Sequence, residues 1–229
     1  MKSVINQRKV ARRATLSNIA SLGGLMVLLA SVVISLFKPE YITYANVLLF
    51  VGLGVSMTGI YFANRWVKKP RPETGLDMEL KQLSHAHRLY HYPALPSDHV
   101  LLTPNGVVVL ETVNLASQFT YKDGRWRERF GVGRALRYIV EEHLGDPIQS
   151  ARGAAEDLER KLGQVVGEDA RPPVKAVVVF THPGAILAVE DPPIPVCRLD
   201  KLRKQVQLPG PRLEQAVYDQ IAVYLDSKM

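Results

Sequence analysis

The sequence is poor in cysteine and has no repeated pattern, and each of these shortages excludes a class of protein. Cys197 is the only cysteine, so the 229-residue chain forms no intramolecular disulfide, which fits a reducing compartment. No internal repeat or low-complexity tract is present, which argues against a solenoid. No Ser-His-Asp or Cys-His arrangement can be built around Cys197 with any specificity, so a cysteine or serine nucleophile is not indicated.

Acidic residues are also scarce over the first third of the chain. Residues 1–69 hold nine of the 29 Lys and Arg but only Glu40 of the 22 Asp and Glu, so the other residues carry 20 basic and 21 acidic side chains. The net charge of +7 and the pI near 9.5 therefore belong to the N-terminal third. A basic pI ordinarily suggests an anionic partner, but here it does not indicate that the rest of the chain binds nucleic acid.

Two long runs lack charge altogether. The first, residues 19–37, would extend about 28 Å as a helix, close to the thickness of a bilayer's hydrocarbon core. The second, residues 41–63, has tyrosines near its ends and small residues that could line a contact between helices. Only the three residues 38–40 separate the two runs. This pattern predicts a transmembrane hairpin over residues 19–63 with both outer ends on one side of the bilayer.

Basic residues flank both runs and predict which side that is. A basic segment, residues 1–18, precedes the first run, and a proline-broken basic linker, residues 64–75, follows the second. The positive-inside rule then predicts an integral protein of the cell membrane with two spans, both termini in the cytoplasm, and the lipid bilayer as a partner. A secretory signal peptide is the competing interpretation of the first run, although it is longer than a usual apolar signal region. A buried helical pair in a soluble protein is the other alternative.

Residues 76–229 have the periodicities of a cytoplasmic α/β domain. The expected elements are a helix over 76–90, strands over 98–103 and 106–114, a hairpin around Asp123-Gly124 with Trp126 as its packing residue, a helix over 146–166 started by Asp146 and Pro147, a buried strand over 174–182, a short strand running into a helical turn over 195–206, and a terminal helix over 211–228.

The strand "GVVVLETVN", residues 106–114, carries one carboxylate, Glu111, out of an apolar run. If Asn105-Gly106 is a two-residue hairpin loop, Asp98 lies opposite Val113, and Asp98, Glu111 and Val113 share one face of the sheet. Two carboxylates that converge there could hold a hard divalent ion such as Mg²⁺. The alternative is a strand end that reaches solvent, with Asp98 as a cap and Glu111 merely exposed.

Four blocks in the same order resemble the nuclease-related domain known as NERD. They are "DHVLLTPNGVVVLETVN", a tryptophan after a "DG" turn, "DPIQSARGAAEDL" and "VKAVVVF", and the resemblance covers roughly residues 76–206. This family is similar to restriction-endonuclease-like nucleases of the PD-(D/E)xK type, which implies a mixed central sheet flanked by helices. The resemblance implies that Asp98 and Glu111 are the metal ligands and that Gln149 supports the catalytic site. It also implies Mg²⁺ as the cofactor of an active enzyme, and no small-molecule cofactor.

The family's lysine, two residues after the glutamate, corresponds to Val113, and there the pattern fails. Valine has neither a proton to give nor a charge to stabilise the transition state. Lys122 on the next hairpin is the candidate for a migrated lysine, and Glu73, Asp77 and Glu79 are candidates for the family's helix glutamate. We therefore expect a catalytically impaired module that binds nucleic acid or a protein partner. The alternatives are an active Mg²⁺-dependent nuclease acting on DNA or RNA near the membrane and a membrane-tethered protein scaffold.

Histidines and arginines allow two weaker interpretations. His87 and His91 would share one face of a helix, as in a two-histidine metal site, but no third ligand stands at a suitable spacing. An arginine run could contact phosphates or the anionic inner leaflet, or could belong to an ordinary solvated hairpin. The run comprises Arg125, Arg127, Arg129, Arg134 and Arg137.

Overall fold

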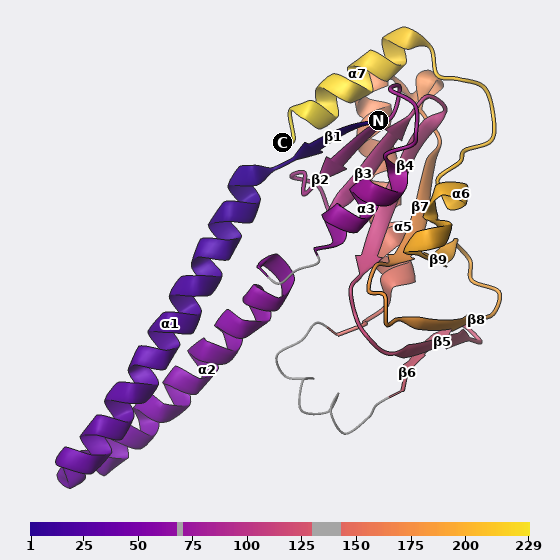
Figure 1. Ribbon diagram of the computed structural model, residues 1–229. Helices are drawn as coiled ribbons and strands as arrows, with labels where there is room; N and C mark the ends of the chain where they lie inside the picture. The colour runs from indigo at the N-terminus through magenta and orange to yellow at the C-terminus, as the bar shows by residue number, and fades with distance from the viewer. Residues whose placement is uncertain (68–70, 130–142) are drawn as a thin grey trace. The chain divides into compact units, whose positions relative to one another are not determined.

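The computed structural model describes residues 1–67, 71–129 and 143–229, and its elements are labelled in Figure 1. The chain divides into two compact units. The α/β unit contains Met1–Asn6, Pro72–Arg129 and Leu144–Met229, and the helical unit contains Gln7–Arg71. The N-terminal six residues thus belong to the same unit as the residues that follow the helical unit. Arg134 and Arg137 of the arginine run lie outside the described residues.

The α/β unit is built from nine short strands and four helices within the described ranges. The strands are β1 (Lys2–Ile5), β2 (Arg88–His91), β3 (His99–Thr103), β4 (Gly106–Val113), β5 (Gln118–Lys122), β6 (Arg125–Glu128), β7 (Val174–Phe180), β8 (Ile186–Val189) and β9 (Val196–Arg198). The helices are α3 (Pro72–Leu80), α5 (Pro147–Val166), α6 (Leu202–Gln205) and α7 (Gln215–Asp226), with 3-10 turns η2 (Glu168–Ala170) and η3 (Leu199–Lys201).

Six strands form the main sheet in the order β1-β2-β3-β4-β7-β9. The neighbours β2, β3 and β4 are antiparallel, whereas the pairs β1–β2, β4–β7 and β7–β9 are parallel. Parallel neighbours need a crossover connection, and α5 lies in the one between β4 and β7. This mixed sheet with helices on its faces confirms the predicted α/β fold class.

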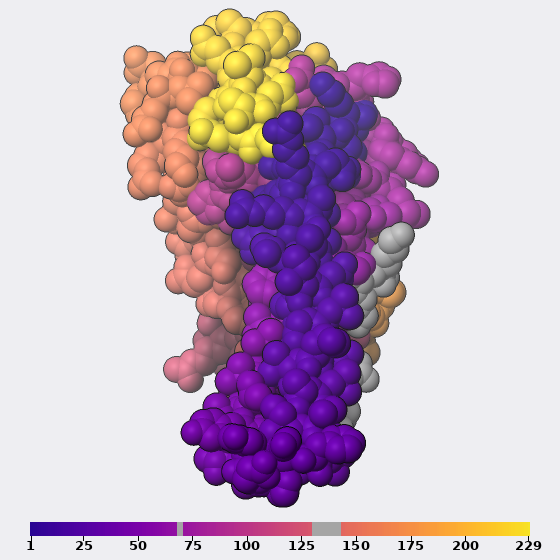
Figure 2. All heavy atoms as spheres, turned by 90° about the vertical axis from the view of Figure 1, so that its left-hand side faces the viewer, coloured from indigo at the N-terminus to yellow at the C-terminus, as the bar shows by residue number. Residues whose placement is uncertain are grey.

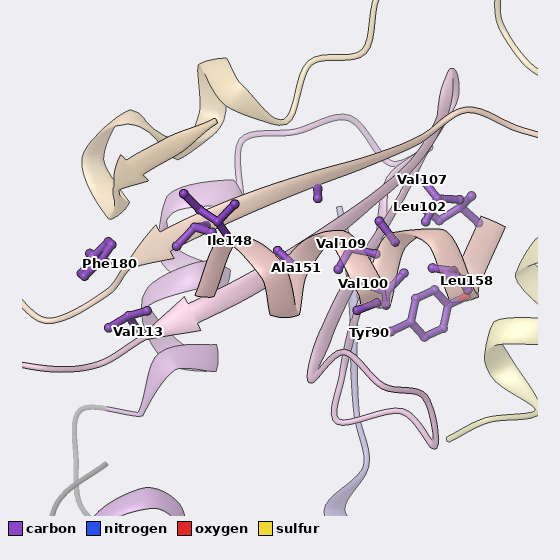
Figure 3. Packing of buried hydrophobic residues seen from close by; sticks show 14 of the residues in the cluster. Tyr90, Val100, Leu102, Val107, Val109, Val113, Ile148, Ala151, Leu158 and Phe180 are labelled. Carbon is purple, nitrogen blue, oxygen red and sulfur yellow. The ribbon is translucent and has the colours of Figure 1, made fainter. Parts of the chain in front are cut away.

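Each face of the main sheet has its own core. Successive residues of β4 alternate between them: Val107 and Val109 pack with α5, and Val108 and Leu110 pack with α3 and α6. Figure 3 shows the α5 side, where Ala151 and neighbouring residues of α5 lie against the strands. Because both faces are covered, β4 and β7 are apolar without alternation, which is the pattern that predicted them as buried strands.

A second sheet, in the order β6-β5-β8, contains the predicted hairpin. Lys122 pairs with Arg125 across Asp123-Gly124, and both turn residues have positive φ, 51° and 75°. The Trp126 ring packs between Tyr121 and Phe180, with ring centroids 5.0 and 5.8 Å away. The expectation that Trp126 is the packing residue of this hairpin is confirmed.

The helical unit consists of α1 (Gln7–Phe37), η1 (Pro39–Tyr41) and α2 (Ile42–Trp66). Its buried residues recur every seventh position, as in a two-stranded coiled coil. They are Val10, Ser17, Gly24 and Ser31 in α1 and Ala45, Gly52, Gly59 and Trp66 in α2. A Cβ atom at Gly24 or Gly59 would collide with Ser56 or Ser21, so these glycines allow the two backbones to approach closely.

One sequence expectation differs from the structure. The helix expected over 76–90 ends at Leu80, and Arg88–His91 is strand β2, so that part of the expectation was wrong. The cause is that β2 pairs with β1 over Lys2–Ile5 and Arg88–His91, and such distant pairing leaves no local signal. The basic segment 1–18 contains strand β1 and the first turns of α1.

Candidate functional site

The turn between β3 and β4 is Pro104-Asn105, because Thr103 pairs directly with Gly106. The predicted loop, Asn105-Gly106, was therefore wrong: the observed loop lies one residue closer to the N-terminus. Gly106 is a strand residue with φ of 149°, and a Cβ there would lie 2.5 Å from the Pro173 carbonyl oxygen. Close approach of a neighbouring backbone, and not the turn itself, accounts for this glycine.

The observed register differs from the predicted one. His99 pairs with Leu110 where the β3–β4 ladder ends, and Asp98 lies in the bend that precedes His99. The sequence had placed Asp98 opposite Val113, a register two residues away from the observed one. A shift of two residues leaves every side chain on its predicted face, because strand side chains alternate with a period of two. Glu111 and Val113 thus keep their predicted face.

Glu111 and Val113 fall on the α5 face of the sheet, since they alternate in step with Val109, which packs with α5. Asp98 and Glu111 are half-buried, whereas Val113 is only 7% exposed. Figure 3 shows Val113 close to Phe180 and Ile148, near the N-terminal end of α5. The position that would hold the lysine is part of the hydrophobic core.

Gln149 lies in the first turn of α5, next to Ile148, and is exposed. The helix starts as predicted: Pro147 is its first residue, and an Asp146 carboxylate oxygen accepts hydrogen bonds from the backbone N–H groups of Ile148 and Gln149, both at 3.1 Å. This capped turn brings Gln149 to the end of the sheet where β4 ends at Val113.

Lys122, the candidate for a migrated lysine, lies at the end of β5 in the second sheet. Its Nζ atom is 2.9 Å from Oε2 of Glu190, and both side chains are exposed. Its charge is therefore engaged by a carboxylate other than Glu111.

The opposite, α3 face carries a buried polar network that the sequence did not reveal. Nδ1 of His91 is 2.9 Å from Nδ1 of His99, and Nε2 of His91 is 3.1 Å from Oδ1 of Asp77. Both imidazoles are buried, at 0% and 1% exposure. We call these three residues the histidine network. His91 had been considered with His87 on a helix; instead it lies on a strand, and its partner is His99.

Glu73 and Tyr92 lie beside this network. The Tyr92 hydroxyl donates to Oε2 of Glu73 at 2.8 Å, and the Tyr92 ring lies 5.1 Å from the His99 ring. Tyr92 has φ of 60°, unusual for a bulky residue, and its backbone N–H donates to the Asp98 carbonyl at 2.6 Å. Tyr92 thus connects Glu73 of α3 to the segment that leads into β3.

Burial and hydrogen bonding shift the pKa values of Asp77 and Cys197. Burial alone would raise the pKa of the Asp77 carboxyl, but hydrogen bonds from His91 and from Ser3 of β1 outweigh it and lower that pKa below its ordinary value of 3.8. Burial raises the pKa of the Cys197 thiol to about 12. That thiol stays protonated at neutral pH, so Cys197 is unreactive.

Within residues 1–67, 71–129 and 143–229, no group of three His, Cys, Asp or Glu side chains is arranged to hold a metal ion. The carboxylates of Glu73 and Asp77 hydrogen-bond to Tyr92 and His91.

Comparison with known proteins identifies one segment of the α/β unit. The family model NERD, the nuclease-related domain, matches residues 72–181. Neither a curated protein nor a solved structure matches the chain. The matched segment begins with the first residue of α3 and ends just after β7, so it includes β2, β3, β4 and α5. Residues 72–181 of this chain are therefore a nuclease-related domain.

Proposed function

We propose that this chain is a membrane-anchored nuclease-related-domain protein with impaired hydrolytic activity, acting as a binding or interaction module. The observation that carries the proposal is Val113. The resemblance to PD-(D/E)xK nucleases places a lysine at this position, two residues after the metal-binding glutamate. An apolar side chain that is only 7% exposed stands there instead.

The loss of that cation accounts for the impairment. A lysine two residues after Glu111 would place positive charge where negative charge develops on a phosphate, and valine offers neither charge nor hydrogen bond. Electrostatic help of this kind is commonly worth about a hundredfold or more in rate. Lys122 is an unsuitable replacement because its Nζ lies 2.9 Å from Glu190.

Asp98 and Glu111 retain carboxylate oxygens of the kind that Mg²⁺ takes. Mg²⁺ is commonly held by one or two carboxylates while it keeps several waters, so this pair fits a weakly held ion. Such an ion would supply Lewis-acid polarisation of a phosphate oxygen. In our proposal Asp98 and Glu111 hold the ion, Gln149 supports the polar rim, and the valine at position 113 supplies no cation to assist hydrolysis.

Membrane anchoring is supported by the helical unit. Both helices are long and apolar enough to cross a bilayer, and only 11% and 17% of the residues in their most apolar windows are buried. A core helix of a soluble protein would be mostly buried. Both ends of this unit continue into the α/β unit, at Asn6 and at Pro72. A folded unit occupies one side of a membrane, so the hairpin enters and leaves on the same side, which the basic flanks assign to the cytoplasm.

Restoring the lysine tests the catalytic part. The full chain, including β1, is purified in detergent as wild type, Val113→Lys and Val113→Met, and incubated with plasmid DNA and Mg²⁺ or Mn²⁺. We expect cleavage from Val113→Lys alone, because methionine gives comparable length without charge. An inactive Val113→Lys variant that is folded would show that more than the lysine is missing.

Labelling of intact cells tests the anchoring part. In a Cys197→Ser background, Glu40→Cys in the hairpin turn should react with a membrane-impermeant maleimide added outside, and Lys228→Cys should react only after lysis. Two outcomes would contradict the proposed orientation: labelling of Lys228→Cys in intact cells, or labelling of Glu40→Cys only after lysis.

Binding assays distinguish a nucleic-acid-binding module from a protein scaffold. Affinity for DNA or RNA that falls steeply with salt would favour a nucleic-acid module. The absence of such binding, with no heat of Mg²⁺ binding by calorimetry, would favour a protein scaffold.

A further inference from the structure

One end of the helical hairpin carries a group of cationic side chains, which we call the basic collar. It comprises Arg8, Lys9, Arg12 and Arg13 of α1 and Arg65 of α2. The four arginines are exposed and Lys9 is partly exposed. Glu40 is the only acidic residue before Glu73, and it lies at the opposite end of the hairpin. The positive charge of the collar is therefore not cancelled by acids of the two helices.

The collar is a single feature shared by both helices. The Ser17 hydroxyl donates to the Gly59 carbonyl at 3.0 Å, which fixes the start of α1 beside the end of α2. The guanidinium carbons of Arg13 and Arg65 lie 5.5 and 5.9 Å from the centroid of the same Trp66 ring. Cation–π contacts at this range hold both charges at one level of the hairpin.

Exposed apolar surface begins directly beyond the collar. Leu16 is 54% exposed and Ile19 is 63% exposed, within two turns of Arg13. Figure 2 shows the outer surface of α1, in indigo, turned toward the viewer. From Ala14 to Phe37 this helix has no charged residue, a length of roughly 36 Å, against about 30 Å for a hydrocarbon core. When the apolar surface lies in hydrocarbon, the collar lies at the level of the lipid headgroups.

The other end of the hairpin is electrically different. Lys38 and Glu40 lie there, with Nζ and Oε1 4.0 Å apart, and their charges cancel. Only the collar end is therefore complementary to a layer of negative charge. A nucleic acid would also complement the positive charge, but it would not cover the adjoining apolar surface. A lipid complements the charge with its headgroup and the apolar surface with its acyl chains.

We propose that the basic collar binds the phosphate headgroups of anionic lipids, holding a shell enriched in them around the hairpin. This inference rests on the proposed membrane anchoring. A basic side chain near an anionic surface contributes on the order of fivefold in binding constant, so several acting together give marked selectivity. The expected partners are lipids with a net negative phosphodiester headgroup, in preference to zwitterionic lipids.

Lipid retention by the full-length chain tests the proposal. The protein is reconstituted into nanodiscs with equal amounts of phosphatidylglycerol and phosphatidylcholine, and co-purifying lipids are counted by native mass spectrometry. We expect about tenfold or greater enrichment of phosphatidylglycerol, reduced severalfold at high salt. Replacing Arg12, Arg13 and Arg65 together by glutamine should abolish most of it, and replacing them by lysine should retain it.

The matched control replaces Arg152, Arg160 and Arg203 of the α/β unit by glutamine, which removes three exposed basic side chains outside the collar and should leave the enrichment unchanged. Equal retention of the two lipids by wild type would overturn the collar proposal while leaving the anchoring intact. A chain that enters vesicles of neither lipid would overturn both. Collar variants that lose DNA binding but keep the lipid preference would assign the collar to nucleic acid and overturn the lipid assignment.

Discussion

At one end of the main sheet, the polar side chains on the two faces differ in how deeply they are buried. On the α3 face, His91 and His99 are fully buried and bonded to each other, and His91 also contacts Asp77. On the α5 face, Glu111 is half-buried and Val113 belongs to the core. Buried polar groups with satisfied partners hold a structure together, so we expect a structural role for the histidine network, whereas our proposal gives Glu111 a binding role.

The largest expected effect is on the α3 face. His91→Ala removes a buried ring and leaves Asp77 and His99 without their mutual partner, so we expect a loss of about 2–4 kcal/mol in unfolding free energy. Denaturant unfolding of the full chain in detergent measures it. Gln149→Ala, on an exposed first turn, is the control and should stay within about 0.5 kcal/mol. Equal effects of the two would erase the distinction between the faces.

Tyr92→Phe should have the next largest effect. The change removes one hydroxyl whose bond to Glu73 is buried, and about 1–2 kcal/mol of unfolding free energy should be lost. Tyr218→Phe removes a comparable bond, from the Tyr218 hydroxyl to the Ala86 carbonyl at 2.8 Å, but in an exposed place. We expect a cost below about 1 kcal/mol there. A larger cost for Tyr218→Phe than for Tyr92→Phe would show that burial does not set the order.

Asp77, on the α3 face, is expected to make the unfolding free energy depend on pH. Its folded pKa lies below its unfolded value near 3.8, so ionised Asp77 stabilises the fold above that value, and the stabilisation is lost as pH falls through the folded pKa. Asp77→Asn should therefore flatten the decline of unfolding free energy below about pH 4. Parallel curves for wild type and Asp77→Asn would show that this carboxylate is not linked to folding.

The smallest effect on stability is expected on the α5 face. Glu111→Gln keeps the shape of a half-buried side chain, and we expect a change within about 0.5–1 kcal/mol in denaturant unfolding. It should, however, remove any Mg²⁺-dependent rise in the unfolding midpoint. A stability loss as large as that of His91→Ala would instead give Glu111 a structural role.

Local patterns predicted much of this domain. The Asp123-Gly124 hairpin, the capped start of α5 and the apolar runs of β4 and β7 each depend on residues close together in sequence. The predicted face of Glu111 and Val113 was also kept despite the two-residue error in register, because that error was even.

Pairing between residues far apart in the sequence was not predicted. Strand β1 pairs with β2 more than 80 residues later, and His91 meets Asp77 and His99 only once α3, β2 and β3 have packed. The four residues of β2 show no alternation of buried and exposed side chains, and the helical spacing of the preceding leucines favoured a helix. A buried polar network of this kind becomes visible only when the sheet is assembled.

The most direct test of impaired catalysis compares the full chain with its Glu111→Ala variant. Both are incubated with plasmid and single-stranded DNA in the presence of Mg²⁺ or Mn²⁺, and cleavage is followed over hours. The account predicts that wild type cleaves no faster than Glu111→Ala. Metal-dependent cleavage by wild type that disappears in Glu111→Ala would contradict it and would make this chain an active nuclease despite Val113.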